Sequence, residues 1–193
     1  MAGPLSFVAL SGQGLALRVD RSVGNCPKYI QARTPRWTGV ASQRLPVRPE
    51  GARLSDADAA LGARADTWFI ASSAPGQCAD VSHHSGMPGF GRVEQSAFGS
   101  VLTWPDFIGN FFFNTLGNIT AHPKAGLLFV DHETGGALQF TGHAAIVASR
   151  AEVDASAGAQ RLLRIKVEAG LWSPEALTLR WSAPQLAPQF DAG

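Results

Sequence analysis

Apolar residues recur at every second position along much of this chain, in short runs that end at glycine and proline. Such alternation is typical of half-buried strands, and glycine and proline mark the turns between them. The pattern predicts hairpins at 4–19, at 68–82 across Pro75–Gly76, and at 125–147 across Glu133–Gly136. It also predicts single strands at 101–104, 162–168 and 177–181.

Two short helices are predicted among these strands. Ser55 stands before an alanine-rich segment and Asp58 follows three residues later, which is the spacing of a capping box. A second helix is expected to start within residues 111–120 and to end before Pro123, because the residue preceding proline disfavours helix. Many short strands with few helices favour a mainly β (α+β) antiparallel barrel over a parallel doubly wound sheet.

The chain divides unequally. Residues 38–53 are rich in Pro, Gly, Ser and Arg, which predicts a surface linker or crossing loop. We therefore expect residues 1–37 to hold an N-terminal hairpin and the GNCPKYI segment, and residues 54–193 to form the main domain. With 193 residues and 45% hydrophobic content, the chain is long enough to bury a core.

Charge and composition exclude several partners. The 16 basic and 15 acidic residues are mixed along the chain, so no basic face for nucleic acid is expected. The sequence has no apolar run of membrane-spanning length and no secretory pattern at its start, so a cytoplasmic location is expected. Cys26 and Cys78 are distant and lack CxxC spacing, which favours free buried thiols.

Polar and glycine residues cluster inside the otherwise apolar segments 80–90 and 102–118. Polar groups there need partners, and a bound ligand is one candidate. A strand, a turn rich in hydroxyl, amide and imidazole groups, and a helix start together suit a phosphate. Neither GxGxxG nor GxxxxGK[ST] is present. The candidate ligand-binding residues are Ser82, His83, His84, Asn114, Thr115 and Asn118.

Each candidate also has a purely structural interpretation. Neighbours on a strand face opposite ways, so at most two of Ser82, His83 and His84 can face one ligand, and the adjacent histidines diverge too far for a metal site. Asn114 and Thr115 equally suit a helix cap.

The residues around these candidates are open to two interpretations as well. Asp106, Gly109 and Asn110 suit either a ligand or a plain turn after Pro105. One residue of Phe111–Phe113 could line a ligand or a dimer contact, while core filling is expected for the other two. Lys28 could activate the Cys26 thiol, or Lys28 or Arg33 could bring positive charge to a phosphate, whereas the alternative for this segment is a structural turn.

Several motifs in order resemble the pyridoxamine 5′-phosphate oxidase-like FMN-binding split-barrel superfamily, over about residues 54 to 182: WFIASSAP, ADVSHHSGMPGF, LTWPDFIGN and GALQFTGHAAI. With GNCPKYIQAR at Gly24–Arg33, the chain is similar to members described as pyridoxamine 5′-phosphate oxidase-related FMN-binding proteins. Those members carry additional sheet before GNCPKYI, so this chain resembles an N-terminally shortened form. The resemblance implies an antiparallel split β-barrel with a few flanking helices. It also implies a homodimer with an FMN site at each side of the interface.

The resemblance assigns roles to further residues. It implies that Gln139 hydrogen-bonds the flavin and that Arg180 and Trp181 reach the flavin of the partner subunit. The chain departs from the superfamily where an Arg or Lys pair commonly stands, because Asn114–Thr115 is uncharged, and where Arg commonly stands, because His84 is present. Phosphate binding is therefore expected either to depend on hydroxyls, amides, helix N–H groups and a protonatable histidine, or to be weaker than in charged relatives.

The resulting hypothesis is an FMN-dependent oxidoreductase that acts on an unknown small substrate or on NAD(P)H. The sequence contains no clear Ser–His–Asp arrangement or carboxylate pair, which disfavours hydrolases, and a flavin would supply the redox chemistry. Oxidation of pyridoxamine phosphate itself is disfavoured because basic residues are sparse in these motifs. Two alternatives stay open: a non-catalytic flavin or haem binding protein of the same fold, and a deazaflavin (F420)-dependent reductase.

Overall fold

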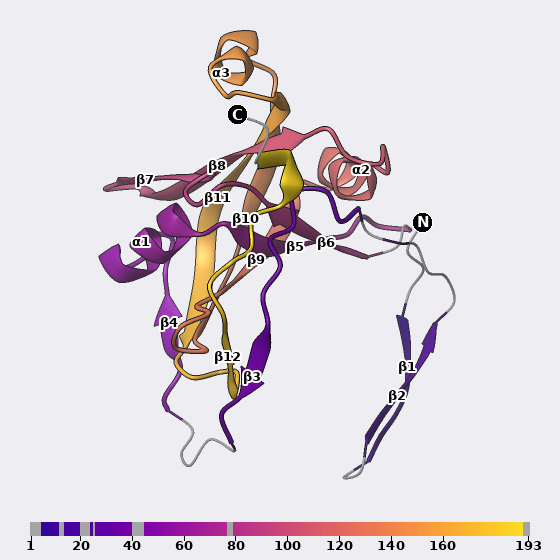
Figure 1. The fold of residues 1–193 in the computed structure, drawn as a ribbon. Coiled ribbons are helices and arrows are strands. Elements are labelled where there is room, and N and C mark those ends of the chain that lie inside the picture. The colour runs from indigo at the N-terminus through magenta and orange to yellow at the C-terminus, as the bar shows by residue number, and fades with distance from the viewer. Residues whose placement is uncertain are drawn as a thin grey trace.

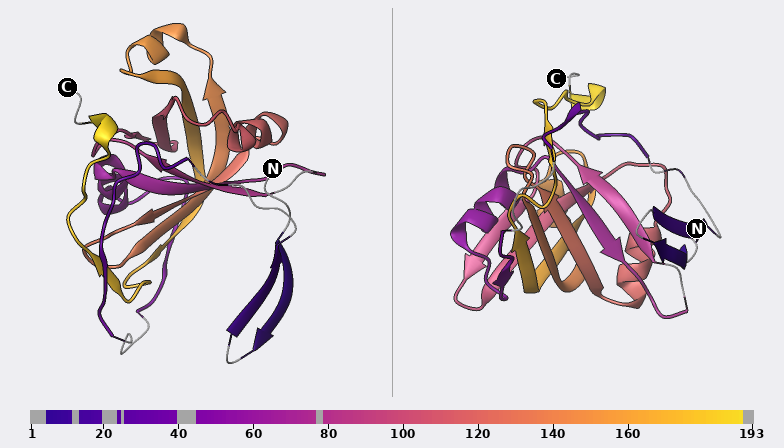
Figure 2. Two further views of the ribbon diagram at one scale, coloured as in Figure 1. Left: turned by 45° about the vertical axis from the view of Figure 1, so that its right-hand side comes forward. Right: turned by 90° about the horizontal axis from the view of Figure 1, so that it is seen from below.

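A strongly curved antiparallel sheet forms the body of the protein (Figures 1 and 2). The computed structural model describes residues 5–11, 14–19, 24, 26–39, 45–76 and 79–190, so Cys78 lies outside the described part. Seven strands follow the order β6-β5-β9-β10-β11-β8-β7, and β4 pairs with the far half of β11. These strands are β4 Arg48–Glu50, β5 Thr67–Ser72, β6 Asp80–Ser85, β7 Arg92–Ser96, β8 Gly99–Phe107, β9 Lys124–Val130, β10 Ala137–Val147 and β11 Ala159–Ser173.

The sheet curls around one core, so that strands from opposite ends of the path face each other. The inner side chains include Trp68, Trp104 and Phe129, all of which are buried. Trp104 of β8 donates its indole N–H to Nδ1 of His84 on β6 at 3.4 Å, which joins the two ends across the core. The antiparallel split barrel predicted from the sequence is confirmed.

The helices lie at the rim of the barrel. Helix α1, Asp56–Arg64, begins as predicted, because the Ser55 hydroxyl accepts from the backbone N–H of Asp58 at 3.2 Å. Helix α2, Asn114–Ala121, ends before His122–Pro123 as predicted and begins after Phe113. The short helix α3, Arg150–Asp154, was not predicted from the sequence.

Two small sheets stand beside the barrel. Strands β1, Leu5–Ser11, and β2, Gly14–Val19, form the predicted N-terminal hairpin, which projects away from the barrel (Figure 2). Strand β12, Leu179–Trp181, pairs with β3, Pro35–Trp37, and a 3₁₀ turn follows at Pro188–Phe190. In the part of the chain that the structure describes, no helix is both long and apolar enough to cross a membrane.

Other strands differ from the prediction in position or length. Strand β4 lies within residues 38–53, which were expected to be a linker, and pairs with β11 through residues 170–172. Strand β8 extends to Phe107, so Asp106 lies in a strand and not in a turn. Strand β7 is exposed at alternate positions and lacks the apolar alternation that marks the other strands.

Strands β10 and β11 approach each other closely at Gly142, beside the bulge between Thr141 and Gly142. A Cβ at this position would lie within 2.0 Å of the Lys166 carbonyl oxygen, which is backbone and cannot rotate away. Gly142→Ala is therefore expected to lower the free energy of unfolding by about 1–3 kcal/mol, as overpacking does. Urea denaturation measures this. Gly126→Ala on β9 is the matched control, because its Cβ would meet nothing closer than 3.8 Å. Equal stabilities of the two variants would contradict the packing described here.

Candidate functional site

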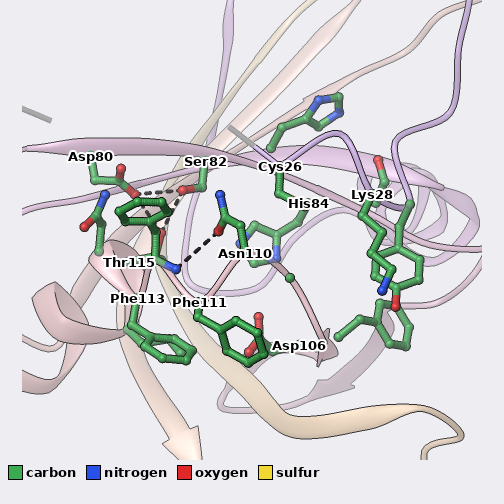
Figure 3. A pocket seen from close by; sticks show the side chains of 18 of the residues that line it. Cys26, Lys28, Asp80, Ser82, His84, Asp106, Asn110, Phe111, Phe113 and Thr115 are labelled. Carbon is green, nitrogen blue, oxygen red and sulfur yellow. Dashed lines mark hydrogen bonds between the residues drawn. The ribbon is translucent and has the colours of Figure 1, made fainter. Parts of the chain in front are cut away.

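A pocket of about 150 Å³ lies between β6, the end of β8 and the start of α2 (Figure 3). Its walls are β6, the end of β8, the loop 109–113, the start of α2 and the segment around Cys26 and Lys28. We refer to it as the end pocket. It gathers residues from elements far apart in sequence, which only the curvature of the sheet brings together.

One corner of the end pocket is built on a buried carboxylate. Asp80 is 6% exposed, and its Oδ2 accepts hydrogen bonds from Thr115 Oγ1 at 2.7 Å and from Ser82 Oγ at 2.8 Å. The two hydroxyl oxygens are 3.0 Å apart. Figure 3 shows these three side chains together. The hydroxyl groups of Ser82 and Thr115 were predicted from the sequence to bind a phosphate. In the structure they donate to the carboxylate of Asp80 instead.

His84 forms the floor of the end pocket. Burial lowers its pKa to about 4; the nearby His83 also lowers it, and Asp80 opposes them. The imidazole is thus neutral near pH 7, which corrects the expectation of a protonatable histidine that would hold a phosphate. Because Nδ1 accepts from Trp104, the ring proton is on Nε2. Nε2–H has no partner in the described part of the chain and can donate to a ligand.

The start of α2 adds further donors. The N-cap residue Phe113 makes no side-chain capping bond, so the first backbone N–H groups of the helix have no partner among the described residues. Asn114 is the first residue of the helix and lines the pocket. Asn118 lies deeper, where its side-chain amide donates to Ser72 and anchors α2 on β5.

The opposite wall carries aromatic and charged side chains. Lys28 lies across the pocket from Asp80 in Figure 3, with its Nζ 5.4 Å from the centre of the Tyr29 ring. Burial raises the pKa of Asp106, and the ion pair with Arg161 at 3.5 Å partly offsets this. Arg33, the other cation considered from the sequence, instead pairs with Asp66 at 2.6 Å, outside this pocket.

The three phenylalanines of the loop are all exposed, which corrects the expectation that two of them fill the core. Phe111, Phe112 and Phe113 are 67%, 60% and 48% exposed, and all three line the end pocket. Phe111 has a φ of 62°, a left-handed conformation that is strained for a bulky residue. The aromatic rim of the pocket is therefore maintained at a cost in backbone energy.

His83 and Gln139 belong mainly to the opposite face of the sheet. Although His83 borders the end pocket, its ring stacks on Phe69 at 4.6 Å and its Nε2 contacts Thr67 Oγ1. Gln139 lies in the same row across the sheet, beside an apolar hollow of about 580 Å³. We refer to this side of the sheet as the outer face. Its exposed apolar side chains include Phe69, Val81 and Leu171.

Arg180 and Trp181 lie on β12, away from both the end pocket and the hollow of the outer face. The Arg180 guanidinium donates to the carbonyls of Leu177 and Leu179, which are near neighbours in the chain. Trp181 contacts His132 edge to face at 5.2 Å. Neither side chain lines the end pocket of this chain.

Five of the nine predicted residues thus line the end pocket: Ser82, His83, His84, Asn114 and Thr115. Sequence reasoning missed Asp80, although the alternation of strand residues could have found it. Asp80, Ser82 and His84 occupy every second position of β6 and pair with the inward residues Ser72, Ile70 and Trp68 of β5.

Comparison with known proteins finds solved structures of similar fold but no protein that is similar in sequence. No protein-family model matches the sequence, and no curated protein matches it. An FAD-binding protein of Mesorhizobium loti has 15% identity and a TM-score of 0.44, over 67% of this chain and 99% of its own.

Two further solved structures are similar to the same degree. HutZ, the heme storage protein from Vibrio cholerae, has 16% identity and a TM-score of 0.42, over 63% and 95% of the two chains. A protein of Clostridium acetobutylicum related to general stress protein 26, of the pyridoxinephosphate oxidase family, has 11% identity and a TM-score of 0.43, over 65% and 91%. Likeness at these values concerns the fold alone.

The end pocket fits one part of FMN and not another. Its aromatic rim and uncharged donors suit the isoalloxazine ring, which offers carbonyl oxygens and ring nitrogens as acceptors. The Asp80 corner does not suit a phosphate dianion, because a buried carboxylate repels it and has already taken the two nearest hydroxyl donors.

The lowered pKa of His84 predicts a specific loss of stability in acid. A histidine whose pKa falls from 6.5 to about 4 on folding binds protons more readily when unfolded, so stability declines as the pH falls through this window. The decline should approach the order of 3 kcal/mol by pH 4. Urea denaturation between pH 7 and pH 4 would show a shallower decline in His84→Gln. His143→Gln, at an exposed position, is the control. An NMR titration giving His84 a pKa above 6 would contradict this.

Proposed function

We propose that the protein binds a flavin non-covalently at the end pocket and acts as a flavin-dependent oxidoreductase on a small substrate or on NAD(P)H. The observation that carries the proposal is the neutral His84, whose Nε2–H faces an aromatic-rimmed pocket beside the uncapped start of α2. A flavin ring has acceptors along one edge and a large apolar surface, so it can use both features.

Hydrogen-bond donors in this pocket would orient the flavin ring and shift its reduction potential. A bound flavin supplies hydride or electron transfer through its ring. The chain would contribute a neutral hydrogen bond from His84, which stabilises negative charge on the ring without transferring a proton. The phenylalanines at the pocket mouth would exclude water from the ring face.

The tautomer of His84 favours a flavin over haem. A haem iron bound at Nε2 would require the imidazole proton on Nδ1, where it would face the N–H of Trp104. Axial ligation by His84 would therefore break that hydrogen bond and leave two donors opposed in a buried place. A deazaflavin would meet the same donors as a flavin, so mass spectrometry of the released ligand distinguishes the two.

We infer that a second copy of the chain completes the site. A pocket of about 150 Å³ is smaller than the roughly 300–1,000 Å³ of a typical cofactor site, so one subunit can cover only part of the ligand. The outer face presents exposed apolar side chains around a hollow, and burial by a symmetric partner would remove them from water.

The identity of the cofactor tests this proposal directly. Protein purified without added cofactor should release a flavin on denaturation, and the visible absorption of the bound flavin should bleach when NADPH is added. His84→Ala should weaken flavin binding about tenfold, the effect of losing one hydrogen bond, in a fluorescence titration. His143→Ala is the control and should bind normally. Release of haem, or equal flavin affinity in the His84 and His143 variants, would overturn the proposal.

Charge on the outer face should dissociate the dimer. Val81 is 59% exposed and lines the hollow of the outer face, so Val81→Asp should raise the dimer dissociation constant by about 30-fold or more, as at a hot spot. Light scattering after size exclusion measures the change. Phe98→Asp, an exposed aromatic in the β7–β8 turn, is the matched control. Monomeric wild-type protein, or equal effects of both variants, would argue against this interface.

A further inference from the structure

The Asp80 corner carries negative charge at the place where the sequence predicted a phosphate. Asp80 is almost fully buried, and its Oδ2 takes the hydroxyl protons of both Ser82 and Thr115. Two donors on one oxygen are the arrangement expected around an ionised carboxylate. Because Thr115 lies in the first turn of α2, this carboxylate lies at the positive end of the helix. The anion that a helix start favours is therefore supplied by the protein.

Nearby positive charge does not cancel this carboxylate. Among the described residues that line the end pocket, Lys28 is the one cation, and it lies on the opposite wall from Asp80 (Figure 3). Arg161 stands behind the wall, where it pairs with Asp106 and lies over the Phe113 ring at 5.0 Å. His84 is neutral near pH 7. A phosphate dianion entering the Asp80 corner would meet a like charge with no cation beside it.

A neutral polyol fits the same corner well. Oδ1 of Asp80 accepts no hydrogen bond within the described part of the chain, so it can accept one from a ligand hydroxyl. The ribityl chain of a flavin ends in a hydroxyl in riboflavin and in a phosphate in FMN. The same carboxylate thus attracts the first ligand and repels the second.

We propose that the end pocket selects riboflavin over FMN, with Asp80 as the residue that determines this specificity. The inference rests on the proposed flavin function and names the form of the flavin. A site that hydrogen-bonds a ligand hydroxyl through a buried acceptor discriminates strongly against a ligand that lacks this donor. A negative charge in its place adds repulsion to the lost hydrogen bond.

Three ligands and two variants test this inference on the full chain. Cofactor-free protein is titrated with lumiflavin, riboflavin and FMN, and binding is followed by the change in flavin fluorescence. Riboflavin should bind about tenfold or more tightly than FMN, and more tightly than lumiflavin, which has no ribityl chain. In Asp80→Asn, the ratio of the FMN and riboflavin dissociation constants should fall about tenfold, because the charge is gone while the shape is kept.

Ser82→Ala is the matched control. It removes one hydrogen bond to Asp80 but leaves the carboxylate charge, so the preference for riboflavin should remain. Binding of FMN as tightly as riboflavin by the wild-type chain would overturn this inference while leaving the flavin function intact. Binding of no flavin at all would overturn both. If Asp80→Asn does not fold, the wild-type comparison alone decides, because it requires no variant.

Discussion

The buried carboxylate of Asp80 is the constraint on which this end of the molecule depends. Removing a carboxylate from water costs several kcal/mol unless polar partners replace the lost hydration. The hydroxyls of Ser82 and Thr115 supply these partners, one from the same strand and one from α2. Satisfying Asp80 therefore requires α2 to sit against β6. The contact between α2 and β6 forms one wall of the end pocket. Asp80 therefore determines both the position of this wall and the negative charge on it.

Alternation along β6 gives neighbouring residues unrelated environments. Asp80, Ser82 and His84 face the core side, whereas Val81 and His83 belong to the outer face. Because the strand period is two, a slip of one residue would exchange these sets and place the carboxylate on the apolar surface. The pairing with β5, whose Trp68 and Ile70 are fully buried, fixes the register.

Local signals predicted local structure well. The N-cap at Ser55, the β9–β10 hairpin and the end of α2 before Pro123 depend on residues close in sequence, and the structure has them. Pairing over long distances was not predictable in this way. Strand β4 forms because residues 48–50 meet β11 more than a hundred residues later, and β8 continues through Pro105 because β11 supports it.

The same limit applies to the candidate site. Sequence reasoning identified Ser82, His84, Asn114 and Thr115, but it assigned them to a phosphate, because residue type alone does not reveal which partner a hydroxyl has. The decisive partners, Asp80 for the hydroxyls and Trp104 for the imidazole, are set by tertiary packing. The exposed positions of Phe111, Phe112 and Phe113 likewise follow from where the loop leaves the barrel.

Together, Asp80 and His84 define the electrostatic character of the end pocket. The Trp104 indole fixes the histidine tautomer and burial keeps the ring uncharged, so His84 cannot replace the arginine that commonly stands at this position in the superfamily it resembles. Asp80 adds a negative charge that this histidine cannot neutralise. Loss of one cation alone would weaken an anion site, but a buried carboxylate at the same corner reverses its preference. The chemistry that remains is that of neutral donors toward a ring and an acceptor toward hydroxyls.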